Sequence, residues 1–237
     1  MRVLALMVLI SAGVFAQAQT TLPDWYLPLR EAVYEQNLKA DEILPVYREV
    51  SDKARQVLSG AELYVMLSRC EYMMGRAYQY EERKAEAASH YSEGINWAEK
   101  ALEASLSAEA WQMRAENTSQ SCAVRSVAYA MANGLNVEKF AKNALAINSR
   151  NAAAQYMIAA RWVFAPAPFH NYRKGIEMMN AILSGADPDK DDFFNVHLAI
   201  GYAYVQQKKY SDARPWLLKA LEVYPTHKYA RELLAKS

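Results

Sequence analysis

The stretch FNVHLAIGYAYVQQKKYSDARPWLLKALEVYP, residues 194–225, decides the fold. Two runs of helix-favouring residues flank a short polar segment, and the small residues Gly201, Ala213 and Ala220 recur among large apolar ones. Small residues let two helices approach closely, and Pro225 stops the second run. The stretch therefore predicts a tight pair of antiparallel helices.

The spacing within this stretch resembles the tetratricopeptide repeat (TPR), a helix pair of about 34 residues. The matching residues are His197, Ile200, Gly201 and Tyr204 on the first helix, Ala213, Leu217 and Ala220 on the second, and Pro225 at the end. Only His197 departs, because the family usually has Trp there, and we expect it to be structural. The resemblance implies helices at 194–207 and 210–223 and an all-α, right-handed superhelical solenoid of antiparallel helix pairs.

Weaker copies of the same frame lie upstream. We expect repeats to start near Ser68, Thr118, Ala152 and Phe194, an array with irregular intervals. The predicted helices of these copies are 84–104, one long helix at 108–133, and 172–183.

The N-terminal part of the array is predicted to be a cap. Residues 24–38 and 40–58 each have the pattern of an amphipathic helix, so residues 19–60 are expected to form a helical cap and residues 61–237 the repeat array. Residues 228–236 are expected to be a C-terminal capping helix.

Residues 1–18 differ from the rest of the chain and are predicted to be a signal peptide. Arg2 precedes an apolar run at 3–15, and Ala16-Gln17-Ala18 fits a small-x-small cleavage site. The run is too short to span a membrane, so cleavage rather than stable insertion is expected. We expect an exported protein, periplasmic or secreted, and not a lipoprotein, because the first cysteine is Cys70.

Charge and cysteine content exclude some classes of partner. The chain has 27 Lys and Arg residues against 26 Asp and Glu, so its charge gives no attraction to nucleic acid or anionic lipid. Cys70 and Cys122 are the two cysteines. We favour buried free thiols over a disulfide, which remains the alternative.

A search for chemistry in the sequence predicts no catalytic residue, no metal site and no cofactor. The histidines lack the paired spacing of zinc ligands, and no nucleophile motif or phosphate-binding glycine loop is present. The acidic pairs Glu81-Glu82 and Asp191-Asp192 are interpreted as solvated turn residues.

The resemblance to the TPR family implies a concave surface lined by the first helix of each repeat. Its candidate partner-binding residues are Arg69, Tyr72, Arg76, Tyr129, Tyr156, Asn195, Leu198 and Tyr202. Arg69 and Arg76 could hold a carboxylate, although the lysine and asparagine set of the family's carboxylate-clamp members is missing. An open groove and a surface partly filled by the chain's own N-terminal helices are both open alternatives. In the loop at 165–172, Phe169 either faces outward or, as we favour, packs back on its own repeat.

The sequence thus predicts an exported, non-catalytic TPR-like scaffold that binds a protein or peptide segment, in an envelope assembly. The alternative is a periplasmic carrier of a small apolar ligand, similar to the T component of tripartite (TRAP-type) transporter systems. The identity of the partner and the formation of homo-oligomers are left open.

Overall fold

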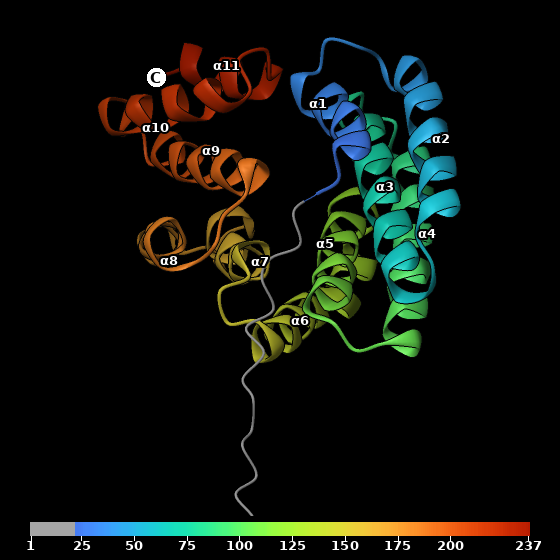
Figure 1. Ribbon diagram of the computed structural model, residues 1–237. Coiled ribbons are helices and arrows are strands. Elements are labelled where there is room, and N and C mark those ends of the chain that lie inside the picture. Colours follow the sequence, from blue (N-terminus) through green and yellow to red (C-terminus); the bar gives the residue numbers. More distant parts are fainter. Residues whose placement is uncertain (1–21) are drawn as a thin grey trace, which may run out of the picture.

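The computed structural model describes residues 22–237, so the predicted signal peptide at 1–18 lies outside the described residues. This part of the chain is all-helical (Figure 1). A short 3₁₀ turn, η1 (Asp24–Tyr26), comes first. It is followed by α1 (Leu27–Glu35), α2 (Ala40–Val57), α3 (Gly60–Tyr80), α4 (Lys84–Ala104), α5 (Ala108–Val124), α6 (Val127–Ile147), α7 (Ala152–Phe164), α8 (Tyr172–Gly185), α9 (Lys190–Gln206), α10 (Tyr210–Val223) and α11 (Lys228–Ala235).

Consecutive helices pack in pairs, α3 with α4, α5 with α6, α7 with α8 and α9 with α10, and each pair also contacts the next. The predicted all-α, TPR-like solenoid is confirmed. The decisive stretch forms α9 and α10 with the expected turn between them, and α4 has the predicted bounds.

Small residues determine how closely the two helices of a pair can pack. A methyl group added at Gly201 would lie 2.5 Å from a methyl carbon of Leu217, so α9 and α10 could not keep their separation with any larger residue there. Gly75 of α3 is likewise covered by the ring of Tyr91 on α4. These are the positions that the repeat frame assigns to close helix contact.

Buried hydrogen bonds tie neighbouring pairs together. The Ser68 hydroxyl of α3 donates to the carbonyl of Gly94 on α4 at 2.7 Å, and the side-chain amide of Asn117 on α5 donates to Ser68 Oγ at 3.2 Å. Because buried polar groups are costly unless paired, this network fixes the register of three helices.

The second repeat differs from the prediction. The chain breaks at Arg125-Ser126, where the Ser126 hydroxyl accepts a hydrogen bond from the backbone of Tyr129 and caps α6. A continuous helix at 108–133 is therefore wrong. Thr118 lies inside α5, which begins at Ala108, and Ser68 lies inside α3, which begins at Gly60, so both helix pairs begin earlier than the predicted repeat starts.

The array curves until α1 meets the C-terminal helices. In Figure 1, α1 lies between α3 and the end of the chain formed by α9, α10 and α11. The ring of Tyr34 in α1 stacks on Tyr224 with centroids 4.6 Å apart and meets the edge of Phe194 at 5.5 Å. The Thr226 hydroxyl donates to the carbonyl of Glu35 at 2.6 Å. The N-terminal helix thus bridges the two ends of the array.

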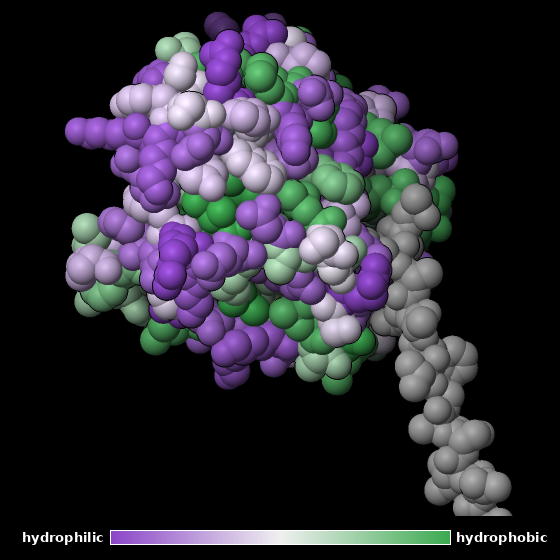
Figure 2. Space-filling view, turned by 90° about the vertical axis from the view of Figure 1, so that its left-hand side faces the viewer, coloured by the Kyte–Doolittle hydropathy of each residue, from purple (hydrophilic) through white to green (hydrophobic). Residues whose placement is uncertain are grey.

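The outer face of the C-terminal repeats is largely polar. Figure 2 looks onto this side and shows hydrophilic residues over much of it, with hydrophobic residues in patches between them. None of the helices within residues 22–237 combines the length and apolar character needed to cross a membrane.

Candidate functional site

The repeats line an open groove of about 840 Å³ on their inner side, which we call the inner groove. It is lined by α3, α5, α6, α7, α9 and α11 and by the loop after α7. Its lining residues are Tyr72, Arg76, Gln79, Ser119, Gln120, Cys122, Ala123, Ala130, Met131, Gly134, Leu135, Val137, Glu138, Tyr156, Met157, Ala160, Arg161, Phe164, Ala165, Pro166, Phe169, Asn195, Leu198 and Tyr229. A groove of this size can hold either a peptide segment of several residues or one small molecule.

Five of the eight predicted partner-binding residues are brought together in this lining: Tyr72, Arg76, Tyr156, Asn195 and Leu198. They come from α3, α7 and α9, the first helices of three pairs, as the repeat frame implies. Their role in binding stays a prediction, but their common location is a fact of the fold.

The other three predicted residues do not line the inner groove. Arg69 lies near Tyr26 and Glu116 at the end occupied by α1; burial lowers the pKa of its guanidinium, but Coulombic interactions with these and other neighbours together raise it more. Tyr129 falls in the first turn of α6, because the second repeat starts earlier than predicted, and its ring lies under Arg125 at 5.0 Å. Tyr202 packs against Phe164 with centroids 5.1 Å apart.

Arg76 sits among tyrosines at the edge of the groove. Its guanidinium carbon lies 4.7 Å from the ring centroid of Tyr34, 5.7 Å from that of Tyr72 and 5.3 Å from that of Tyr80. Its nitrogens donate to the hydroxyls of these same three tyrosines. Cation–π contact and hydrogen bonds together hold the side chain in one place.

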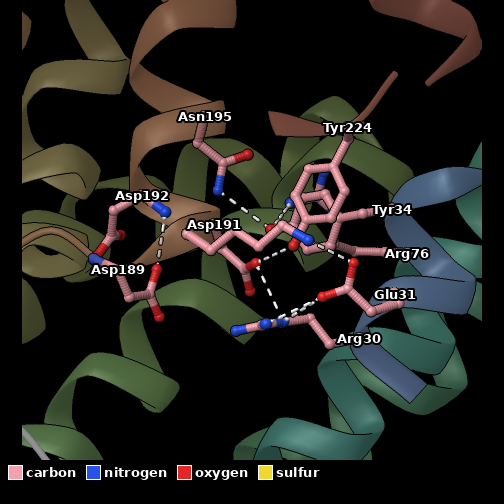
Figure 3. A network of polar contacts seen from close by, with 10 residues as sticks. Arg30, Glu31, Tyr34, Arg76, Asp189, Asp191, Asp192, Asn195 and Tyr224 are labelled. Atoms are coloured by element: carbon pink, nitrogen blue, oxygen red, sulfur yellow. Dashed lines mark hydrogen bonds and ion pairs between the residues drawn. The ribbon is translucent and has the colours of Figure 1, made fainter. Parts of the chain in front are cut away.

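One end of the concave surface is filled by α1, and Figure 3 shows the polar side chains that α1 places against the repeats there. The Tyr34 hydroxyl accepts hydrogen bonds from Arg76 at 3.4 Å and from the side-chain amide of Asn195 at 3.2 Å. Both donors are predicted groove residues. Of the two alternatives for this surface, partial filling by the N-terminal helices therefore describes this end, and an open groove describes the other.

The filled end contains buried charge. Asp191 accepts a hydrogen bond from the Tyr224 hydroxyl at 2.6 Å and lies 3.6 Å from Nε of Arg30. Burial raises the pKa of Asp191 to about 7 and, against the opposing effect of Arg69, that of Glu116 to about 7. Lys190 pairs with Glu31 at 2.5 Å across the same seam. The interpretation of Asp191-Asp192 as solvated surface is wrong, because both are buried at the junction of α1 and α9.

The open end carries exposed apolar side chains. Met131 is 79% exposed, Leu135 75%, Phe169 68% and Phe164 46%, and all four line the inner groove. We call these four residues the apolar rim. Phe169 therefore faces outward, contrary to the favoured interpretation that it packs on its own repeat. Exposed apolar side chains that gather at one groove are typical of interaction surfaces.

Several acidic and basic side chains within residues 22–237 are paired with one another. Glu138, in the groove, pairs with Lys142 at 2.8 Å and with Arg161. His90 pairs with Glu71 at 2.6 Å, and Glu71 also accepts from the Tyr47 hydroxyl. Cys70 and Cys122 are both free. Within residues 22–237 no three His, Cys, Asp or Glu side chains are grouped so that they could hold a metal ion.

Two features of the site were not predicted from the sequence. The apolar rim depends on α6, whose residues 127–137 carry no charge, a signal that was available but was hidden by the misplaced repeat. The contact of α1 with α9 and with the segment after α10 joins residues far apart in the sequence, so no local pattern predicts it.

Family models match two parts of the chain. The tetratricopeptide repeat matches residues 194–227, which confirms the predicted superfamily in the C-terminal repeat. A solved structure, that of YrrB, described as a TPR protein with an unusual peptide-binding site, is 15% identical, with 88% of this chain and 89% of that chain covered and a TM-score of 0.40. No curated protein matches the sequence. The family described as "Regulator of microtubule dynamics protein 1-3" matches residues 30–188, which span more than half of the chain and run from α1 into the turn before α9. The chain belongs to this family.

Proposed function

We propose that this chain is a non-catalytic repeat scaffold that binds a protein or peptide segment in the inner groove. The observation that carries the proposal is the groove itself: about 840 Å³, lined from four helix pairs and bordered by the exposed apolar rim. A groove that opens to solvent beside apolar side chains suits an extended or helical segment.

A binding role is also supported by the state of the ionisable groups. The carboxyls with the most perturbed pKa values, Asp191, Asp192 and Glu116, lie at the end filled by α1, where Asp191 engages Tyr224 and Arg30. Perturbed pKa values alone would suggest a catalytic site. Here they follow from burial within the closure of the array, so they need no reaction to explain them.

A small apolar ligand is the second candidate, and the volume of the groove favours it as well. Pockets for small molecules span about 300–1,000 Å³ and are mostly apolar, as are Met157, Leu198 and Val137 in this lining. The exposed rim weighs against a carrier, because a carrier encloses its ligand.

Export remains part of the proposal and rests on the sequence of residues 1–18. N-terminal sequencing of the chain purified from its native host tests it. A first residue at or near Gln19 would support export, whereas an intact N-terminus in the cytoplasmic fraction would contradict it.

The test of binding is selection from a random-peptide library displayed on phage. We compare the purified chain with the double variant Tyr156→Ala/Leu198→Ala, which truncates two groove residues, and with Tyr210→Ala/Leu218→Ala, which truncates two exposed residues that do not line the groove. Peptides should be enriched by the wild type and the control pair and lost on the groove pair, with circular dichroism confirming the fold of each.

Enrichment that survives in the groove pair would rule out this site. If no peptide is enriched and native mass spectrometry finds a small molecule bound in equal stoichiometry, the carrier is the correct function.

A further inference from the structure

The charged residues of the inner groove are unbalanced. Three of its lining residues carry charge: Arg76, Arg161 and Glu138. Glu138 is paired with Arg161 and with Lys142. Arg76 forms no ion pair with any carboxylate within residues 22–237. The groove therefore has one positive charge that no ion pair within residues 22–237 neutralises.

The surroundings of Arg76 make that charge available to a ligand. A guanidinium has five N–H donors, and four hydrogen bonds from Nε, Nη1 and Nη2 reach tyrosine hydroxyls. One N–H of Nη2 remains for a further acceptor. A partly buried charge that is bonded only to neutral groups gains more from a carboxylate than from water, because the local dielectric is lower.

The position of Arg76 relates this charge to the rest of the groove. Arg76 touches α1 through Tyr34 and also lines the open groove, so it stands at the boundary between the filled and open ends. The apolar rim lines the same cavity from α6, α7 and the following loop. An occupant of the groove can therefore meet one unpaired cation and a set of exposed apolar side chains at once.

We propose that the inner groove takes a peptide segment that combines an acidic side chain, bound by Arg76, with apolar side chains that pack on the rim of Met131, Leu135, Phe164 and Phe169. The inference rests on the proposed function and adds the chemistry of the partner. Charge complementarity selects an Asp or Glu over a neutral residue, and the apolar rim separates such a segment from a merely acidic one.

The experiment begins with the peptides enriched on the wild-type chain. Each is synthesised with a fluorescent label and an amidated C-terminus, so that only side chains can supply a carboxylate. Each is also made with its Asp or Glu replaced by Asn or Gln. Dissociation constants are then measured by fluorescence anisotropy against wild type, Arg76→Gln, Arg76→Lys and the matched control Arg161→Gln, which removes the other groove arginine.

We expect the amide peptides to bind wild type and Arg161→Gln about tenfold or more weakly than the acidic peptides, as a charge-assisted hydrogen bond predicts. Against Arg76→Gln the two peptides should differ by less than about twofold, because the partner of the carboxylate is gone. Arg76→Lys should restore part of the difference, since it keeps the charge but loses the planar fork. The comparison on wild type stands even where Arg76→Gln lowers thermal stability.

Other outcomes separate the two proposals. Enriched peptides that lack acidic residues, or an acid-to-amide ratio that is equal for wild type and Arg76→Gln, would overturn the inference and leave the proposed function standing. No enrichment at all would remove the proposed function, and the inference with it. Flotation with vesicles of phosphatidylglycerol and phosphatidylcholine completes the test. Binding to these vesicles that depends on Arg76, without peptide binding, would assign the site to an anionic lipid and reject the peptide.

Discussion

The two ends of the concave surface belong to one array of repeats, but one end is covered and the other is exposed. At one end α1 covers the repeats, and Tyr26, Leu29 and Tyr34 are almost fully buried. At the other end no helix takes that place within residues 22–237, and Met131 and Leu135 are largely exposed. The contrast shows that this chain covers one end of its inner surface with its own N-terminal helix and leaves the other end open.

The filled end also suggests what the open end can hold. There one of the contacts between the repeats and α1 is the ring of Tyr34, whose hydroxyl accepts hydrogen bonds from both Arg76 and Asn195. These two side chains also border the open groove. A partner at the open end would therefore bind to N–H groups of the same residues that α1 leaves unused. The site for the partner would then lie directly beside the contact with α1.

The largest expected effect comes from breaking the filled end. Tyr34→Ala removes a buried ring that stacks on Tyr224 and meets Phe194. Truncating a buried aromatic residue costs about 3–5 kcal/mol, so the free energy of unfolding measured in urea should fall by that amount. Hydrogen exchange should also accelerate in α1 more than in α4. The control Tyr210→Ala, at an exposed site, should change the free energy by less than about 0.5 kcal/mol. Equal losses for the two variants would mean that α1 is not docked in solution.

Features that depend on contacts within one repeat could be predicted from the sequence, whereas features that depend on contacts between distant repeats could not. The pair α9–α10 followed from local spacing, because Gly201 and Leu217 meet within one repeat. The break at Arg125-Ser126 was missed because it contains neither Gly nor Pro. Its only local mark is the capping hydroxyl of Ser126.

The closure by α1 could not be predicted in the same way. It depends on the rotation between successive pairs summed over the array, and small differences at each junction decide where the last pair arrives. For this reason the burial of Asp191 and the filling of one end of the concave surface became visible only in three dimensions. Arg76 and Asn195 were placed correctly because the repeat frame fixes which face of a first helix points inward.

A smaller effect is expected in the pH dependence of stability, which we compare for one carboxyl from each end. Burial raises the pKa of Glu116 to about 7, so the folded chain binds a proton there that the unfolded chain has released above about pH 4.5. That contribution to stability is fully present below the unfolded pKa and is lost as the pH rises through 7. The stability of wild type relative to Glu116→Gln should thus fall by about 2 kcal/mol from about pH 5 to about pH 8.

Glu138 at the open end should show the opposite sign. Hydrogen bonds from Lys142 and Arg161 lower its pKa against the effect of burial, so its contribution is present at neutral pH and is lost as the pH falls through the folded pKa. Glu138→Gln should cost up to about 1 kcal/mol near neutral pH and nothing in acid. Urea titrations of both variants across this range measure the two slopes. Slopes of the same sign would show that the two carboxyls do not occupy the different environments described here.

The smallest effect is expected at the apolar rim and tests whether the open end is open. Met131→Ala should change the free energy of unfolding by less than about 0.5 kcal/mol, because an exposed side chain gains little from folding. The matched variant Met113→Ala, at a fully buried methionine, should cost about 2–5 kcal/mol. If Met131→Ala proves as costly as Met113→Ala, the rim is covered in solution. A cost that grows with protein concentration would then identify a second copy of the chain as the cover, since only an association between molecules makes stability depend on concentration.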